Sequence, residues 1–221
     1  IVGEKMPNGK VEIRGYGKTD STGVKRGIVV NIEETVDAIK TAVAQASEQS
    51  KVNIKSVNVG IAGHHIKSIQ HRGTLIRENA DIEISDQELD KLRLDMFKLR
   101  TAPGEEIVNV IPQEYYVDGE AVGSKRPKGM LGNKLEANFH VIVGQTSAVK
   151  NILKCIEHAG LEMENMILEP IASAASVLGE DEKEAGVAIV DIGGGTTDVA
   201  VFYDSIIYHT AVIPFGGNFS S

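Results

Sequence analysis

The most informative part of this sequence is the stretch Val187-Ala-Ile-Val-Asp-Ile-Gly-Gly-Gly-Thr-Thr-Asp-Val-Ala-Val-Phe-Tyr203. Two apolar runs flank a turn of three glycines, which predicts a β-hairpin. Glycine lacks a Cβ atom, so the backbone of this turn can adopt a positive φ and approach an anion closely. Its N–H groups can then converge on phosphate oxygens. We therefore expect Gly193, Gly194 and Gly195 to bind a phosphate group.

Polar residues on both sides of the glycines extend this interpretation. The hydroxyls of Thr196 and Thr197 are expected to join the phosphate site. Asp191 and Asp198 would repel a phosphate unless a divalent cation lies between them, and Mg²⁺ is commonly held by one or two carboxylates plus substrate phosphates. We predict that both aspartates reach Mg²⁺, largely through water. The alternative is a plain hairpin turn, which needs neither three glycines nor flanking carboxylates.

The two commoner phosphate loops do not fit this stretch. A Walker A loop ends in Gly-Lys-Ser/Thr, and a Rossmann loop is followed at once by a helix. Here Val199, Val201 and Phe202 follow, and these residue types favour a strand. The run Asp-Ile-Gly-Gly-Gly-Thr-Thr-Asp instead resembles the second phosphate loop of the actin/Hsp70/sugar-kinase ATPase superfamily.

Composition narrows the class of protein further. A chain of 221 residues has room for one or two domains with a real core. The net charge of −8, without a long basic run, argues against sequence-independent binding to nucleic acid. Cys155 is the only cysteine, which excludes an internal disulfide and fits a reducing compartment. Because no apolar run reaches the roughly 18–20 residues of a membrane span, we expect a soluble, cytoplasmic protein.

Hydrophobic spacing and turn residues predict alternating helices and strands. Asn31 is the expected N-cap of one helix, and Ser85 with Glu88 forms the capping-box pattern of another. Pro112 implies an edge or a bulge in its strand. Residues 180–184 are expected to form a charged turn. The predicted strands are 1–6, 11–16, 56–62, 66–70, 74–76, 107–117, a half-buried strand at 135–143, 163–168 and 206–213, and the predicted helices are 32–49, 85–100, 146–160 and 172–178.

Short matches spread along the chain resemble the FtsA family of bacterial cell-division proteins. They are Arg26-Gly27, Asn31-Ile-Glu-Glu-Thr-Val36, Val59-Gly-Ile-Ala-Gly-His-His-Ile66, Val110-Ile-Pro-Gln-Glu-Tyr115, Gly160-Leu161 and the stretch from Ile213-Pro214 to Gly217-Asn218. The resemblance implies an α/β, actin-like (RNase H-like) ATPase fold that is incomplete here and carries an inserted small α/β subdomain. Subdomain 1A would comprise 1–62 and 143–184 without its first strand and phosphate loop. Subdomain 1C would be 63–142, and 185–221 would begin subdomain 2A.

The same resemblance implies cofactors and further site residues. ATP and Mg²⁺ would bind in a cleft. Glu169 occupies the place of the Glu in the Asn-Glu-Pro-Thr-Ala-Ala run of Hsp70-like proteins, so it would position the attacking water. The alternative is a carboxylate that merely stabilises a helix start. Gly216 and Gly217 resemble the glycine pair that approaches the nucleotide, although a simple turn would also explain them.

In biological terms, the resemblance implies a protein that polymerises through its inserted subdomain. It would link the ring of the tubulin-like protein FtsZ to the inner face of the cytoplasmic membrane at midcell. The FtsZ-contacting region, the adenosine-binding loop and the C-terminal membrane helix of the family are not found in this sequence. We therefore expect this chain alone to be inactive as an ATPase. Other superfamily members remain alternatives: a type IV pilus actin-like assembly protein, an Hsp70-like chaperone or a sugar kinase.

Overall fold

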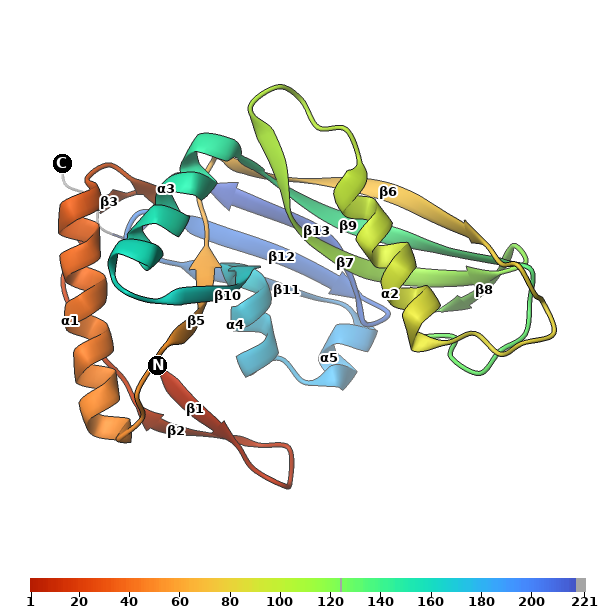
Figure 1. Ribbon diagram of the computed structural model, residues 1–221, viewed down its shortest axis with the longest axis horizontal. Coiled ribbons are helices and arrows are strands. Elements are labelled where there is room, and N and C mark those ends of the chain that lie inside the picture. Colours follow the sequence, from red (N-terminus) through yellow and green to blue (C-terminus); the bar gives the residue numbers. More distant parts are fainter. Residues whose placement is uncertain (124, 218–221) are drawn as a thin grey trace. The chain divides into compact units, whose positions relative to one another are not determined.

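The computed structural model describes residues 1–123 and 125–217. Asn218, which ends one of the matched stretches, therefore lies outside the described residues. The chain forms two compact units. The first comprises Ile1–Ile61 and Ser147–Ile167, and the second comprises Ala62–Thr146 and the segment from Leu168 onward. The elements are labelled in Figure 1.

The first unit contains the predicted N-terminal hairpin and capped helix. Strands β1 (Val2–Lys5) and β2 (Val11–Gly15) pair antiparallel. Helix α1 (Ile32–Ser50) begins as predicted, because the Asn31 side chain accepts a hydrogen bond from the backbone N–H of Glu34 at 3.2 Å. The other elements of this unit are β3 (Val24–Lys25), β4 (Ile28–Val29), β5 (Ser56–Ile61), α3 (Thr146–His158) and β10 (Glu162–Leu168), of which β5 and β10 pair. No helix among the described residues is long and apolar enough to span a membrane.

The second unit contains a four-stranded antiparallel sheet in the order β6-β9-β7-β8. Its strands are β6 (Ile66–Ile76), β7 (Glu105–Val117), β8 (Glu120–Gly123) and β9 (Lys134–Gln145). Helix α2 (Asp86–Asp95), extended by the short helix η1 (Met96–Lys98), buries Leu89, Leu92 and Met96 against this sheet. Phe139 of β9 lies at the centre of this core and is 1% exposed. The bulge predicted at Pro112 is confirmed, since the β7–β9 register shifts between Pro112 and Glu114.

Several sequence predictions in this region were wrong in detail. Strand β6 is continuous, because it pairs with β9 along its whole length, including Gly73. Helix α2 ends at Asp95 rather than near Arg100 and tightens into η1. Strand β9 is buried on both faces instead of one, since His140 lies 3.0 Å from the Thr210 hydroxyl of a second sheet. The expected turn at 180–184 is the short helix α5 (Glu180–Ala185).

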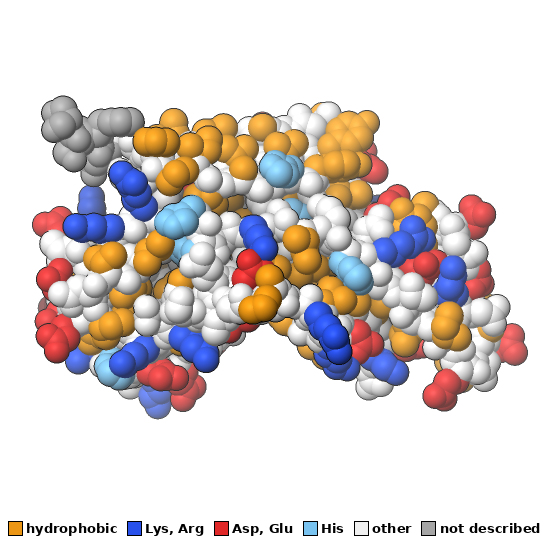
Figure 2. Space-filling model, turned by 90° about the horizontal axis from the view of Figure 1, so that it is seen from above, with side chains coloured by type: hydrophobic (Ala, Val, Ile, Leu, Met, Phe, Trp, Pro, Cys, Tyr) orange, Lys and Arg blue, Asp and Glu red, His pale blue; other side chains and the backbone are white. Residues whose placement is uncertain are grey.

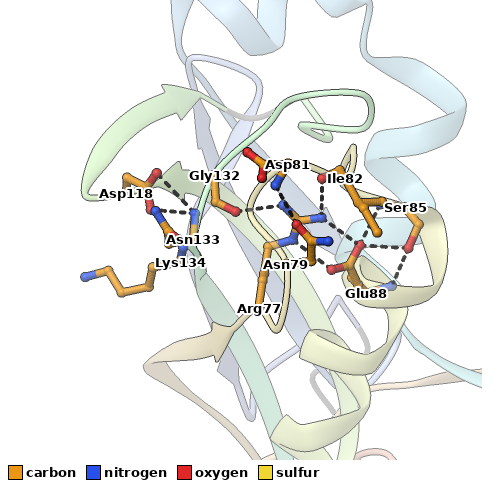
Figure 3. A network of polar contacts seen from close by, with 10 residues as sticks. All are labelled: Arg77, Asn79, Asp81, Ile82, Ser85, Glu88, Asp118, Gly132, Asn133 and Lys134. Atoms are coloured by element: carbon orange, nitrogen blue, oxygen red, sulfur yellow. Dashed lines mark hydrogen bonds and ion pairs between the residues drawn. The ribbon is translucent and has the colours of Figure 1, made fainter.

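A buried arginine fixes the loops at one end of the four-stranded sheet (Figure 3). The Arg77 side chain is 2% exposed, and its Nε donates to Glu88 at 2.7 Å. Its terminal nitrogens donate to the carbonyls of Gly132 and Ile82, each at 2.7 Å. Glu88 also accepts from the N–H and hydroxyl of Ser85, which completes the predicted capping box. Every partner in this network is therefore supplied by the protein itself.

The second sheet of this unit is the three-stranded meander that contains the glycine turn. Strands β11 (Val187–Ile192), β12 (Thr197–Tyr203) and β13 (Ile206–Ile213) pair antiparallel in that order. Helix α4 (Glu169–Val177) packs against one face through Ala174, which contacts an apolar cluster containing Ala200 and Phe202. The opposite face leaves Val190 and Ile192 exposed. On the surface shown in Figure 2, Lys and Arg side chains are interspersed with Asp and Glu.

Candidate functional site

The predicted hairpin exists, and its geometry brings the two aspartates together. Strands β11 and β12 are joined by residues 193–196, and the N–H of Gly193 donates to the Thr196 carbonyl at 2.9 Å. Asp191 lies directly opposite Asp198 in the register. Directly opposed residues of an antiparallel pair point to the same face, where two like charges destabilise the sheet. The site therefore concentrates negative charge beside the glycine turn.

The three glycines of the turn do not adopt the backbone conformation that the sequence predicted. Gly193, Gly194 and Gly195 are not among the described glycines with positive φ, so that part of the prediction was wrong. A glycine is required at position 216, because a Cβ atom on Gly216 would come within 2.5 Å of backbone atoms of all three glycines of the turn. The N–H of Gly217 donates to the Gly193 carbonyl at 2.8 Å. Both predicted glycine elements thus meet in one structure, a turn backed by a second backbone segment.

The two threonine hydroxyls have partners within the protein. Thr196 is buried, and its hydroxyl lies near enough to the carboxyl group of Asp198 to lower the pKa of that group. The Thr197 hydroxyl donates to the Phe215 carbonyl at 2.7 Å. In the ligand-free structure the Thr197 hydroxyl therefore ties the turn to the 214–217 segment, and the predicted contact of both hydroxyls with phosphate stays a prediction.

Asp198 is the most unusual residue of the site. It is 2% exposed, and its buried Oδ1 atom has no hydrogen-bond partner. Burial raises the pKa of its carboxyl group, and the charge of Asp191 raises it further, against the opposing effect of the Thr196 hydrogen bond. A buried carboxylate oxygen without a partner is costly. Its presence here points to a ligand that the protein does not itself supply.

Glu169 contributes a third carboxyl group to the same electrostatic environment. It is the first residue of α4, which has Pro170 in its first turn. Much of the residue is accessible to solvent, yet desolvation of its carboxyl raises its pKa, and the charges of Asp198 and Asp191 add to that shift. The predicted residues Glu169, Asp191 and Asp198 are therefore close enough to influence one another.

Ser173 belongs to this site, although sequence reasoning did not select it. Its hydroxyl donates to Oδ2 of Asp191 at 2.5 Å. Ser173 follows Glu169 by four residues, and residues at this spacing share one face of a helix. The spacing alone could have suggested Ser173, but only once α4 was known to contact β11.

The residues present fit Mg²⁺ bound largely through water and phosphate. Among residues 1–123 and 125–217, no cationic side chain pairs with any of the three carboxyl groups. The same residues contain no group of three His, Cys, Asp or Glu side chains arranged to hold a metal directly. The unpartnered Oδ1 of Asp198 and the carboxylate of Asp191 would therefore face a hydrated cation. Water molecules and phosphate oxygens would complete the coordination of such an ion.

Family models match two regions of the chain. The model "SHS2 domain inserted in FTSA" matches residues 63–143, and the model "Cell division protein FtsA" matches residues 188–220. The first match covers the four-stranded sheet with its helix α2, and we call it the SHS2 segment. The second match contains the glycine hairpin.

Curated relatives and a solved structure match almost the whole chain. The "Cell division protein FtsA" of Pseudomonas aeruginosa is 42% identical over 99% of this chain and 52% of the relative. Those of Neisseria meningitidis and Escherichia coli strain K12 are 39% and 36% identical over similar spans. A chain of the "PilM-PilN type IV pilus biogenesis complex" has a TM-score of 0.59 at 14% identity, covering 90% of this chain and 53% of that chain.

The structural match bears on the fold of this chain, and the sequence matches bear on its family. The structural likeness, at low identity, concerns the fold alone, which is the predicted actin-like α/β fold with its inserted subdomain. This chain spans about half the length of the curated relatives it matches. With more than a third of its residues identical to theirs along 99% of its length, the chain belongs to the FtsA family of bacterial cell-division proteins.

Proposed function

We propose that the protein carrying this chain is an actin-like cell-division protein that binds ATP with Mg²⁺ at the glycine hairpin. The observation behind the proposal is the pairing of Asp191 with the buried, unpartnered Asp198 beside a turn of three glycines. A purely structural hairpin would gain nothing from two opposed carboxylates. A bound cation with its phosphates would compensate both charges.

The chain's own residues take distinct roles in this proposal. The N–H groups of the turn, from Gly193 to Gly195, would bind phosphate oxygens, and Gly216 allows the backbone segment behind the turn to support it. Asp191 and Asp198 would hold hydrated Mg²⁺, which supplies charge neutralisation for the phosphates. Glu169 would orient the attacking water, because phosphoryl transfer needs positioning and charge stabilisation rather than covalent help.

The direct test is a calorimetric titration of MgATP into the natural full-length protein. We expect binding by the wild type and loss of at least tenfold in affinity for Asp191→Ala. Asp181→Ala is the matched control, since it removes an exposed carboxylate of α5 and leaves the hairpin untouched. The absence of MgATP binding by the folded wild-type protein would reject the proposal.

We further propose that the protein polymerises through the SHS2 segment and links FtsZ to the cytoplasmic membrane at midcell. The support is the family membership together with the match of residues 63–143 to the inserted domain of FtsA. The test is sedimentation of the full-length protein with ATP, anionic vesicles and FtsZ. Filaments that form on vesicles and recruit FtsZ would support the proposal. A protein that stays in the supernatant under all conditions would contradict it.

A further inference from the structure

Helix α4 is joined to the aspartate pair by one specific contact. Its Ser173 hydroxyl donates to Oδ2 of Asp191 at 2.5 Å, and α4 lies beside β11 (Figure 1). A hydroxyl group has a single proton to donate. Ser173 therefore commits its donor to the carboxylate of another element.

This behaviour is unusual for a serine inside a helix. Such a serine commonly donates to a backbone carbonyl one turn earlier in its own helix. Ser176 does so within α4, since its hydroxyl donates to the Ser173 carbonyl at 2.8 Å. The same helix thus contains a serine with the ordinary local contact and a serine that reaches the hairpin. The difference identifies Ser173 as part of the site.

A hydroxyl group lies near each of the two aspartates. The Ser173 hydroxyl donates to one oxygen of Asp191, and the Thr196 hydroxyl lowers the pKa of the Asp198 carboxyl. Oδ1 of Asp198 remains buried without a partner. The carboxylate of Asp191 is therefore oriented by a hydroxyl, which restricts its rotation before any ligand arrives. Oriented ligands bind a metal more tightly because less rotamer freedom is lost.

We propose that Ser173 is a positioning residue that orients Asp191 for the cation. The inference rests on the proposed binding of MgATP at the hairpin. It also gives α4 a role in that site beyond Glu169, because Glu169 and Ser173 lie one turn apart on this helix. Ser173 touches neither the cation nor the phosphates in this proposal and acts only through the Asp191 carboxylate.

The test is the Mg²⁺ dependence of ATP binding to the full-length protein. ATP binding is titrated by calorimetry at increasing Mg²⁺ concentrations for wild type, Ser173→Ala, Ser173→Thr and the control Ser176→Ala. Removal of such orienting groups typically costs about 10–100-fold in metal affinity. Because this cation is expected to bind partly through water, we expect the Mg²⁺ midpoint of Ser173→Ala to rise about tenfold. Ser173→Thr should restore the wild-type midpoint, and Ser176→Ala should not change it.

A double-mutant cycle separates positioning from a general packing role. In an Asp191→Ala background, Ser173→Ala should have no further effect on the Mg²⁺ midpoint, because the carboxylate to which its hydroxyl donates is gone. An equal effect in both backgrounds would overturn the inference, as would a Ser173→Ala midpoint equal to that of Ser176→Ala. Wild-type protein that binds MgATP alongside such a result would leave the proposed function standing. Wild-type protein that binds no MgATP would reject both.

Discussion

The Arg77–Glu88 network and the Asp191–Asp198 pair show two ways of placing carboxylates in one chain. Glu88 has a buried guanidinium as its partner, and its pKa is lowered to about 2, chiefly by the hydrogen bond from Arg77. Asp198 has no cation within the described part of the chain, and burial raises its pKa. The first arrangement is complete without a ligand. The second retains an unsatisfied oxygen.

The difference separates a structural network from a candidate binding site. In the first network the donors of Arg77 are matched by Glu88 and two backbone carbonyls, so it holds loops together and leaves little for a ligand. At the hairpin, Asp191 lies directly opposite Asp198, and two like charges in this position destabilise the sheet. Native proteins retain such local conflicts mainly at functional sites. Substitutions in the Arg77–Glu88 network and at the Asp191–Asp198 pair test this difference.

The largest effect is expected for Arg77→Met. The substitution keeps an apolar stem but leaves Glu88 without its cation and the carbonyls of Gly132 and Ile82 without donors. We expect the free energy of unfolding to fall by about 3 kcal/mol in chemical denaturation. The control is Arg126→Met, whose partners Asp86 and Asp90 are exposed, and whose loss should cost less than about 1 kcal/mol. Equal costs for the two variants would contradict the comparison.

Acid should weaken the same network to a smaller extent. The pKa of Glu88 is about 2 in the folded protein, below its value in an unfolded chain. Its ionised form therefore adds stability that is fully present above about pH 4.3 and is lost as the pH falls toward 2. Arg77 keeps its two carbonyl partners throughout, so the loss is smaller than for Arg77→Met. Denaturation at several pH values should show wild type and Glu88→Gln converging in this range, and a constant difference would argue against the network.

Gly216→Ala should lower the free energy of unfolding by about 2 kcal/mol, because it disturbs the packing at the end of the hairpin. Its Cβ would come within 2.5 Å of backbone atoms of the glycine turn, which cannot move aside as a flexible side chain can. Gly217→Ala is the matched control, because its nearest such contact is 3.8 Å and the Gly217 hydrogen bond to Gly193 is retained. Thermal denaturation and MgATP titration of the full-length protein should both distinguish the two variants. If the two alanines behave alike, the close packing of this segment does not support the turn.

Asp198→Asn should change the free energy of unfolding least and, unlike the other substitutions, should raise it. Asp198→Asn removes one of two opposed charges and lets an amide face Asp191, so the ligand-free protein should gain about 0.5–1 kcal/mol. The same substitution should abolish Mg²⁺-dependent ATP binding. Denaturation without ligand and calorimetry with MgATP measure the two effects on one variant. A destabilised Asp198→Asn protein would mean that the carboxylate is structural, like that of Glu88.

Local patterns predicted most of the elements but not their continuity. The helix starts at Asn31 and Ser85 and the bulge at Pro112 are confirmed, because caps and proline act over a few residues. The single strand β6 was predicted as two, since its pairing with β9 depends on contacts far apart in sequence. The burial of His140 on the second face of β9 has the same origin.

At the candidate site, the local sequence was sufficient to predict the hairpin, because three glycines lie between two apolar runs with an aspartate on each side. The hairpin and its register could be predicted in this way because a turn and the strands that it joins are set by neighbouring residues. The tertiary structure was needed to show why position 216 must be a glycine, since Gly216 packs against backbone atoms more than twenty positions earlier in the chain. It also decided that Ser173 donates to Asp191 and that one oxygen of Asp198 is left without a partner. Hydrogen bonding and burial between distant segments depend on packing, which no local pattern encodes.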